Sequence, residues 1–186
     1  MHIPEIVPVL SANQLEETVA ALGRTISSDF GEKGVVAVCV LKGAFVFFAD
    51  LIRALTIPVE VDFLGAASYG AQTVPSGKIE LTKPLESDIK DRQVLVVEDI
   101  IDTGATACAL LNHLEAFSPA RIRLCALLDK QQRRTHDIRV DYSGHVVKEG
   151  FLVGYGLDWN GLYRNLKGIY RLKEYALNQT KHEDVE

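Results

Sequence analysis

The sequence lacks an apolar run long enough to span a membrane. Its longest uninterrupted apolar run, Val35 to Leu41, is far shorter than the roughly 20 residues that a membrane helix needs. The first residues, Met1 to Glu5, have neither the basic region nor the apolar region of a signal peptide. We therefore expect a cytoplasmic protein with no membrane partner.

Cysteine is scarce, and the three residues stand among apolar neighbours: Cys39, Cys108 and Cys125. An odd number of cysteines in such surroundings argues against a disulfide framework and predicts buried thiols in a reducing compartment. The chain has no CxxC motif, and its five histidines show no metal-ligand spacing. A structural zinc site is therefore not expected.

Basic residues are fewer than acidic residues in this sequence. Lys and Arg number 20 against 25 Asp and Glu, so the formal charge is −5. This balance argues against a protein held to nucleic acid by phosphate contacts. Hydrophobic residues make up 47% and charged residues 24% of the chain, which are ordinary values for a folded globular protein. The length of 186 residues suits a single domain, expected to span residues 1–186.

Helical and strand patterns alternate along the chain. A capping box formed by Ser11 and Gln14 predicts the start of a helix. Its apolar face follows steps of three and four residues and consists of Leu15, Val19, Leu22, Ile26 and Phe30. A second helix is expected to turn Phe45, Phe48, Ala49 and Ile52 toward the core, and a third to span about 105–117. Buried strands are expected at 35–41, 59–64, 94–97 and 122–128, a short flanking strand at 78–82, a long loop at 65–77 and a frayed end at 178–186. The alternation predicts an α/β fold with a parallel sheet.

The segment from Val94 to Thr106 carries most of the chemistry. A buried strand leads into Glu98 and Asp99, and a turn then precedes a helix. Open parallel sheets bind ligands beyond the carboxyl ends of their strands. The run from Asp102 to Thr106 supplies backbone amides and two hydroxyls at a helix N-terminus, where a phosphate is readily bound. The two preceding carboxylates can hold sugar hydroxyls, or a metal beside them.

A purely structural interpretation competes with this one. Asp102 or Thr103 could simply cap the helix, while Glu98 and Asp99 remain solvated. However, three acids, two threonines and one glycine lie within nine residues directly after a buried strand. That density favours a phosphate and sugar site.

Val94 to Thr106 resembles the phosphoribosyl-pyrophosphate (PRPP) motif of type I phosphoribosyltransferases. Four other segments occur in the order seen in the hypoxanthine-guanine members of that family: Leu41-Lys42-Gly43, Ser68-Tyr69-Gly70, Leu127 to Lys130 and Phe151 to Asp158. The resemblance extends from about Val35 to Arg164. It implies a parallel-sheet type I phosphoribosyltransferase fold with a flexible lid loop and a small hood region. It also implies Mg²⁺-dependent transfer of the phosphoribosyl group to a 6-oxopurine in purine salvage.

By that resemblance, Glu98 and Asp99 hold the ribose hydroxyls. The 5′-phosphate is assigned to Asp102, Thr103, Gly104, Ala105 and Thr106. The pyrophosphate is assigned to Lys42, Gly43 and Arg164, and family members often have a cis peptide before that lysine. Asp102 is the candidate general base for the purine N7 proton. Taken alone, Lys42 and Arg164 could equally be surface residues.

The resemblance also implies a purine pocket made by Lys130, Phe151, Leu152 and Asp158. Lys130 would donate to the purine O6, Phe151 would stack on the base, and Leu152 would read its edge through backbone groups. The alternatives are a solvated lysine, an ordinary core aromatic and an exposed acid that caps a helix. Mg²⁺ is assigned to Glu98, Asp99 and Asp158, and the lid to Ser68 and Tyr69. Family members are usually dimers or tetramers, so a homo-oligomer is expected.

The sequence departs from the family pattern in three places. Gln131 stands where bacterial relatives often have proline, Ala66-Ala67 replace small polar residues, and Ala105 occupies a variable position of the phosphate loop. Two other nucleotide motifs fail: Gly154-Tyr155-Gly156 lacks the third glycine of a dinucleotide fingerprint, and no Walker A sequence is present.

Two rival functions remain open at this point. The first is an enzyme of the same fold that prefers xanthine, adenine or a pyrimidine. The second is a regulator that senses PRPP and binds nucleic acid, which would require a clustered basic surface. The adjacent Arg133 and Arg134 give that second function only weak support.

Overall fold

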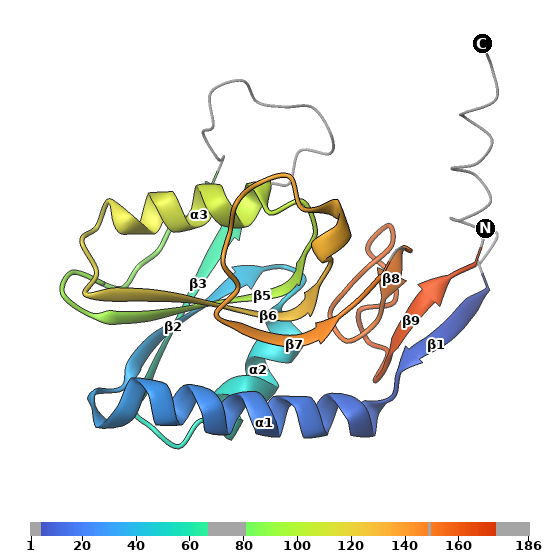
Figure 1. Cartoon of the computed structure of the whole chain (residues 1–186), viewed down its shortest axis with the longest axis horizontal. Helices are drawn as coiled ribbons and strands as arrows, with labels where there is room; N and C mark the ends of the chain where they lie inside the picture. Colours follow the sequence, from blue (N-terminus) through green and yellow to red (C-terminus); the bar gives the residue numbers. More distant parts are fainter. Residues whose placement is uncertain (1–4, 67–80, 149, 174–186) are drawn as a thin grey trace, which may run out of the picture.

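A computed structural model describes residues 5–66, 81–148 and 150–173. In these residues a six-stranded sheet lies between helices, and a smaller three-stranded sheet stands at one end (Figure 1). The helices are α1 (Ala12–Phe30), α2 (Phe45–Ala54) and α3 (Ala105–Glu115), with short 3-10 turns η1 (Gly31–Lys33) and η2 (Gln131–Arg133). The strands are β1 (Ile6–Leu10), β2 (Val35–Leu41), β3 (Val59–Ala66), β4 (Leu81–Lys83), β5 (Gln93–Ile101), β6 (Arg121–Asp129), β7 (Tyr142–Val146), β8 (Leu152–Val153) and β9 (Ile169–Leu172).

The larger sheet has the strand order β4-β3-β2-β5-β6-β7. All its neighbouring pairs are parallel except β3 and β4, which are antiparallel. In Figure 1, α1 and α2 cover one face of this sheet and α3 covers the other. The expected α/β fold with a parallel sheet is therefore confirmed.

Burial on both faces explains why β2 is apolar without interruption. Ala37 and Cys39 belong to the core beneath α1 and α2. Val36 and Val38, which alternate with them, belong to the core beneath α3. Since successive side chains of a strand point to opposite faces, a strand covered on both sides needs an apolar residue at every position.

Helix α1 has the expected face and the expected cap. All five residues of its predicted apolar face are at most 7% exposed. The backbone N–H of Gln14 donates to Ser11 Oγ (3.3 Å), and the backbone N–H of Ser11 donates to Gln14 Oε1 (2.9 Å). Each bond satisfies an amide that the first turn of a helix leaves without an intrahelical partner.

Helix α2 is rotated from the predicted orientation. Its buried residues are Phe47, Phe48 and Leu51, whereas Phe45 is 43% exposed and Ala49 is also exposed. The prediction of Phe45 and Ala49 in the core was wrong, although Phe48 was correct and Ile52 is half-buried. Because α2 is apolar around most of its circumference, periodicity does not determine which face is turned to the sheet.

Several predicted boundaries also change. β5 continues through Glu98 to Ile101 because its later residues pair with β6, for example Glu98 with Ala126. Glu98 thus lies within the sheet and not in the turn after it. β3 extends to Ala66, and α3 ends at Glu115. The lid residues Ser68 and Tyr69, part of the predicted 78–82 strand and the predicted frayed end lie outside the described residues.

The small sheet corresponds to the expected hood. It has the order β1-β9-β8, with both pairs antiparallel, and it lies beside the carboxyl ends of the central strands in Figure 1. Pairing of β8 with β9 closes the segment from Gly154 to Gly168 into a loop next to that edge. Within the described part of the chain, no helix is long and apolar enough to cross a membrane.

Candidate active site

The candidate site lies where the order of the strands reverses direction. β2 and β5 are neighbours at the centre of the sheet, but β2 continues through α2 to β3 on one side and β5 continues through α3 to β6 on the other. The two connections leave a crevice at the carboxyl ends of the strands, where open α/β sheets bind ligands. Lys42 and Gly43 follow β2, Asp102 follows β5 and Lys130 follows β6. The peptide bond between Leu41 and Lys42 is cis.

Two positions at this crevice have room only for glycine, because another group lies where a side chain would begin. A Cβ atom on Gly43 would lie 1.8 Å from Asp99 Oδ2, so a larger residue would displace that carboxylate. A Cβ atom on Gly156, in the loop of the hood, would lie 2.2 Å from the carbonyl oxygen of Gly43. The end of β2, the end of β5 and the hood loop are therefore in direct contact.

Two adjacent carboxyl groups occupy the end of β5. Glu98 is 8% exposed, and burial together with the neighbouring Asp99 raises its pKa well above the usual value. Burial raises the pKa of Asp99 to about 6, while the Arg164 guanidinium acts in the opposite direction. Since both groups are short of compensating charge, this position favours a cation or hydrogen-bond donors. The alternative of a fully solvated Glu98 is wrong.

The hood contributes an arginine and an acid to the same edge. Arg164 NH1 donates to the carbonyl oxygen of Gly156 (2.6 Å), and its NH2 lies 2.5 Å from Asp158 Oδ1. Asp158 Oδ2 accepts the backbone N–H of Gly161 (2.8 Å). Both residues are half-buried, so neither is a free surface group, and both act electrostatically on Asp99.

The turn from β5 to α3 has the backbone form of a phosphate loop. Gly104 adopts a left-handed φ of 85° and precedes the first residue of α3, with no side-chain cap. Thr103 Oγ1 accepts only a long bond from the Ala105 N–H (3.4 Å). Among the described residues, the Asp102 carboxylate accepts a bond from Arg133 and none from an amide of α3. The interpretation of Asp102 as a helix cap was therefore wrong. Among the described residues, the other amides at the N-terminus of α3 have no acceptor, and they lie at the positive end of the helix dipole.

The two carboxylate oxygens of Asp102 differ in their contacts within the described structure. Its Oδ2 lies 3.3 Å from Arg133 NH1 and 3.7 Å from Lys130 Nζ. Its Oδ1 is buried and has no hydrogen-bond partner in the described structure. An unsatisfied buried acceptor is costly, so its persistence indicates a place where a ligand donates a hydrogen bond.

Lys130 is buried beside Asp102, with 7% exposure. Its Nζ donates to the carbonyl oxygen of Gly150 (2.9 Å). Burial lowers its pKa, and the nearby Asp102 carboxylate partly opposes that shift. The alternative of a solvated lysine is therefore wrong, since few lysines are buried without a specific reason.

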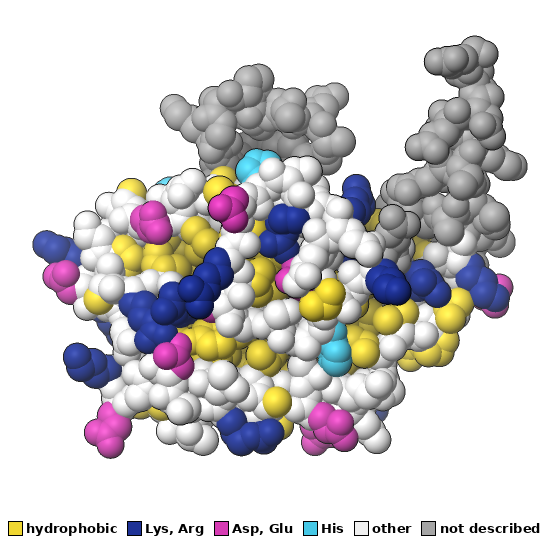
Figure 2. Space-filling model, in the orientation of Figure 1, with side chains coloured by type: hydrophobic (Ala, Val, Ile, Leu, Met, Phe, Trp, Pro, Cys, Tyr) yellow, Lys and Arg dark blue, Asp and Glu magenta, His cyan; other side chains and the backbone are white. Residues whose placement is uncertain are grey.

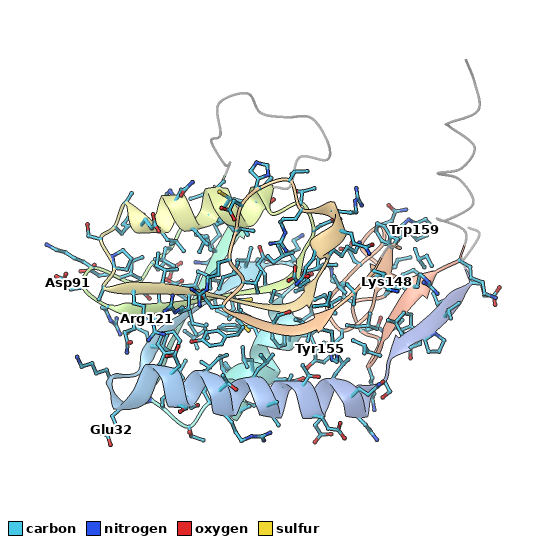
Figure 3. All side chains as sticks on the ribbon, in the orientation of Figure 1. Glu32, Asp91, Arg121, Lys148, Tyr155 and Trp159 are labelled. Atoms are coloured by element: carbon cyan, nitrogen blue, oxygen red, sulfur yellow. The ribbon has the colours of Figure 1, made fainter. Side chains whose placement is uncertain are left out.

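The remaining residues of the predicted purine pocket lie at the start of β8. Phe151 is half-buried and precedes the strand, while Leu152 lies within it and is 7% exposed. Leu152 belongs to the core beneath α1 and α2. In Figure 3, Tyr155 from the same segment lies between the larger sheet and α1, and its hydroxyl donates to Asp50 of α2 (2.5 Å).

The segment that follows β6 contributes residues to the site that the sequence pattern does not indicate. Arg133 and Arg134 form an adjacent basic pair in the sequence, and in the structure both contact Asp102. Gln131, the departure from proline, donates from Nε2 to Asp129 Oδ2 (3.1 Å), so it stabilises this turn. The only signal in the sequence was the position of these residues directly after Lys130.

The described residues contain no group of three or more His, Cys, Asp or Glu side chains placed to hold a metal ion. Mg²⁺ in nucleotide enzymes, however, is commonly bound by one or two carboxylates together with substrate oxygens and water. The buried pair of Glu98 and Asp99, whose pKa values burial raises despite the nearby Arg164, fits that requirement.

Comparison with known proteins gives a consistent set of similarities. The phosphoribosyl transferase domain family matches residues 9–160. The chain is 40% identical to a hypoxanthine-guanine phosphoribosyltransferase of Aquifex aeolicus over 89% of this chain and 94% of that protein. It is 38% identical to a hypoxanthine-guanine-xanthine phosphoribosyltransferase of Tritrichomonas foetus, over 87% and 88% respectively. A crystal structure of a hypoxanthine-guanine phosphoribosyltransferase from Bacillus anthracis superposes with a TM-score of 0.87 at 43% identity, covering 90% of this chain and 99% of that one.

Proposed function

The chain belongs to the phosphoribosyl transferase family, and from that premise we propose that it is a hypoxanthine/guanine phosphoribosyltransferase of purine salvage. It transfers the 5-phosphoribosyl group of PRPP to N9 of hypoxanthine or guanine, giving IMP or GMP and pyrophosphate. The observation that carries this proposal is the buried oxygen of Asp102, which has no hydrogen-bond partner in the described part of the chain, beside the buried ammonium of Lys130. An acceptor next to a donor matches N7–H and O6 of a 6-oxopurine. Adenine would instead present its amino donor to a second donor, Lys130.

We assign the 5′-phosphate of PRPP to the loop from Asp102 to Thr106. Its free amides and the helix dipole of α3 attract an anion, and the left-handed Gly104 gives the loop its tight curvature. Ala105 is the first residue of α3 and is exposed. Since backbone amides make most of these contacts, alanine at that position is compatible with phosphate binding.

We assign the ribose hydroxyls to Glu98 and Asp99. Buried carboxylates are strong acceptors for hydroxyl groups, and a bound cation would relieve the repulsion that raises their pKa values. Mg²⁺ held by these two residues would neutralise charge on the pyrophosphate as it leaves. Asp158 is the third predicted ligand, and it would have to exchange its bonds to Arg164 and Gly161 for the metal.

We assign the pyrophosphate to Lys42, Gly43 and Arg164. Lys42 is exposed at the end of β2, and Arg164 is held by Gly156 and Asp158 with its charge near Asp99. Cations placed before the reaction stabilise the negative charge that develops on the leaving group. We assign the purine to Lys130, Phe151, Leu152 and Asp158, with Phe151 against the ring face.

The reaction displaces pyrophosphate at C1′ of the ribose. The N9 lone pair of the N7–H tautomer forms the new bond to C1′, while the bond between C1′ and the pyrophosphate oxygen breaks with its electron pair on that oxygen. Positive charge develops on the sugar, as in glycoside hydrolysis. The proton on N7 moves to the free oxygen of Asp102, which acts as general base.

We further propose a homo-oligomer, a dimer or a tetramer, with α2 at an interface. Phe45 is 43% exposed, and Leu162 in the hood loop is 48% exposed. A groove of about 610 Å³ lies between α1, α2 and residues 164–167. Helices that are apolar on most sides are normally covered. Light scattering should give the mass of two or four chains, and Phe45→Asp should lower that mass; a monomeric wild-type protein would contradict the proposal.

No observation favours a nucleic-acid-binding regulator. In Figure 2 the most evident group of basic side chains surrounds the position of Arg121, which Figure 3 labels. Arg121 pairs with Asp29, and Arg123 and Arg139 pair with Asp141. Guanidinium groups already paired with carboxylates are poorly suited to phosphate contacts. The three free thiols support a reducing compartment, and we propose the cytoplasm. The lid role of Ser68 and Tyr69 and the single-domain organisation stay predictions.

An assay of the purified protein with PRPP, Mg²⁺ and one base at a time tests the proposed function. We expect rapid nucleotide formation with hypoxanthine, guanine or both, and little with adenine. Xanthine is included because its acceptor at position 6 also fits Lys130. Turnover of adenine or a pyrimidine in preference to every 6-oxopurine would refute the proposal.

A further inference from the structure

The segment that follows β6 makes hydrogen bonds to the backbone of the phosphate loop, residues 102–106. The carbonyl oxygen of Asp102 accepts Arg134 Nε (3.3 Å). The carbonyl oxygen of Thr103 accepts the backbone N–H groups of Thr135 (3.0 Å) and His136 (3.2 Å). In a trans peptide the N–H points opposite to the C=O. The N–H groups of Thr103 and Gly104 are thereby turned away from this segment, and neither has an acceptor among the described residues.

The same segment reaches the side chain of Asp102 through Arg133. Arg133 NH1 lies 3.3 Å from Asp102 Oδ2, which is closer than Lys130 Nζ at 3.7 Å. Arg133 thus supplies the nearer of the two cations at Oδ2, while Oδ1 has no hydrogen-bond partner among the described residues. Lys130 can then keep its donors for Gly150 and for a ligand.

We propose that Arg133 is a positioning residue for the transfer reaction. By holding one oxygen of Asp102, it keeps the other oxygen directed at the purine proton. It also prevents Lys130 from forming a closer ion pair with the Asp102 carboxylate. The proposal rests on the proposed function, because it assumes that Asp102 accepts the N7 proton and that Lys130 donates to O6.

Arg133 and its neighbour Arg134 differ in what their removal would do. Arg134 bonds to Asp129 and to the carbonyl oxygens of Asp102 and Ile138, and its side chain is 17% exposed. Its loss would disturb the whole turn. The side chain of Arg133 is 55% exposed, and its contact in the described structure is with Asp102. A substitution of Arg133 therefore tests positioning with little effect on folding.

The test compares Arg133→Gln with a matched control, Arg139→Gln. Arg139 Nε also lies 3.3 Å from a carboxylate oxygen, that of Asp141, and its side chain is 83% exposed. We expect Arg133→Gln to lower kcat by about tenfold, since small misplacements of a catalytic group are costly. KM for hypoxanthine should rise and KM for PRPP should stay unchanged, because Arg133 makes no bond to the backbone of the phosphate loop. Arg139→Gln should match the wild type.

Two further variants separate positioning from a structural role. Arg133→Lys restores a cation and should recover most of the lost kcat. In the Asp102→Asn background the Arg133→Gln change should have almost no further effect, because coupled residues are not additive. A rise in KM for PRPP equal to the fall in kcat, or full additivity with Asp102→Asn, would overturn the proposal.

The outcomes also distinguish this inference from the proposed function. If Arg133→Gln has wild-type kinetics while Asp102→Asn is impaired, the positioning role is refuted and the proposed function stands. If wild-type protein forms no nucleotide from any 6-oxopurine, the proposed function fails first and the inference fails with it.

Discussion

The Asp102→Asn substitution is the sharpest test of how the base is bound. Two cations face Oδ2, namely Arg133 at 3.3 Å and Lys130 at 3.7 Å. The single oxygen of an asparagine should therefore turn toward them, which leaves its NH₂ group at the position of the unpartnered Oδ1. The variant would present a donor to the N7–H donor of the purine. It would lose the general base and also disfavour the reactive tautomer.

The expected decrease in kcat follows from the role of the Asp102 carboxylate as general base. General bases typically contribute 10²- to 10⁴-fold to kcat, which is roughly 3 to 5 kcal/mol of barrier. We expect a fall of at least about 10²-fold in kcat and a higher KM for hypoxanthine. KM for PRPP should be nearly unchanged, because backbone amides hold the phosphate. Steady-state kinetics with each substrate varied in turn would measure all three.

The exposed Asp137 offers a matched control in the neighbouring segment. Asp137→Asn removes one negative charge by the same chemical change and should leave all three constants at their wild-type values. Wild-type turnover in Asp102→Asn would show that Asp102 is not the general base of the reaction. A large rise in KM for PRPP with unchanged kcat would show that its carboxylate serves the phosphate loop instead.

Three other predictions concern packing and pH. Gly43→Ala should raise KM for PRPP by about tenfold or more in steady-state assays, because the new Cβ would lie 1.8 Å from Asp99 Oδ2; an unchanged KM would refute the role of that contact. Asp62→Ala should lower the free energy of unfolding by about 2–4 kcal/mol in urea, because a buried carboxylate accepts three backbone N–H groups; a loss below 1 kcal/mol on that scale would contradict the reasoning. The hydrogen bond from Tyr142 lowers the pKa of Asp29 below 3.8, so its stabilisation is present above about pH 4 and is lost as pH falls through the lowered pKa. The stability difference between wild type and Tyr142→Phe should therefore shrink on acidification, and a constant difference would refute the linkage.

The sequence predicts well those features that local pattern determines. Cap chemistry and one narrow apolar stripe specify α1, and the unbroken apolar run of β2 specifies a strand buried on both faces. α2 has no such stripe, so its orientation depends on tertiary packing that no local pattern records. The end of β5 was placed too early because acidic residues usually lie outside a buried strand, whereas pairing with β6 keeps Glu98 in the sheet.

The same distinction between local pattern and tertiary contact applies to the candidate site. The motif from Glu98 to Thr106 is continuous in sequence, so its acids and glycine are visible without a structure. The burial of Lys130 and the contact of Arg133 with Asp102 depend on the alignment of β5 with β6. Such contacts join residues about thirty positions apart, and residue type alone gives no sign of them.

A crystal structure of the protein with IMP tests the central claim most directly. We expect the 5′-phosphate within hydrogen-bond distance of the amides from Thr103 to Thr106. We also expect O6 to lie against Lys130 Nζ and N7 against Oδ1 of Asp102. A nucleotide bound elsewhere, with this edge of the sheet empty, would contradict the proposed site.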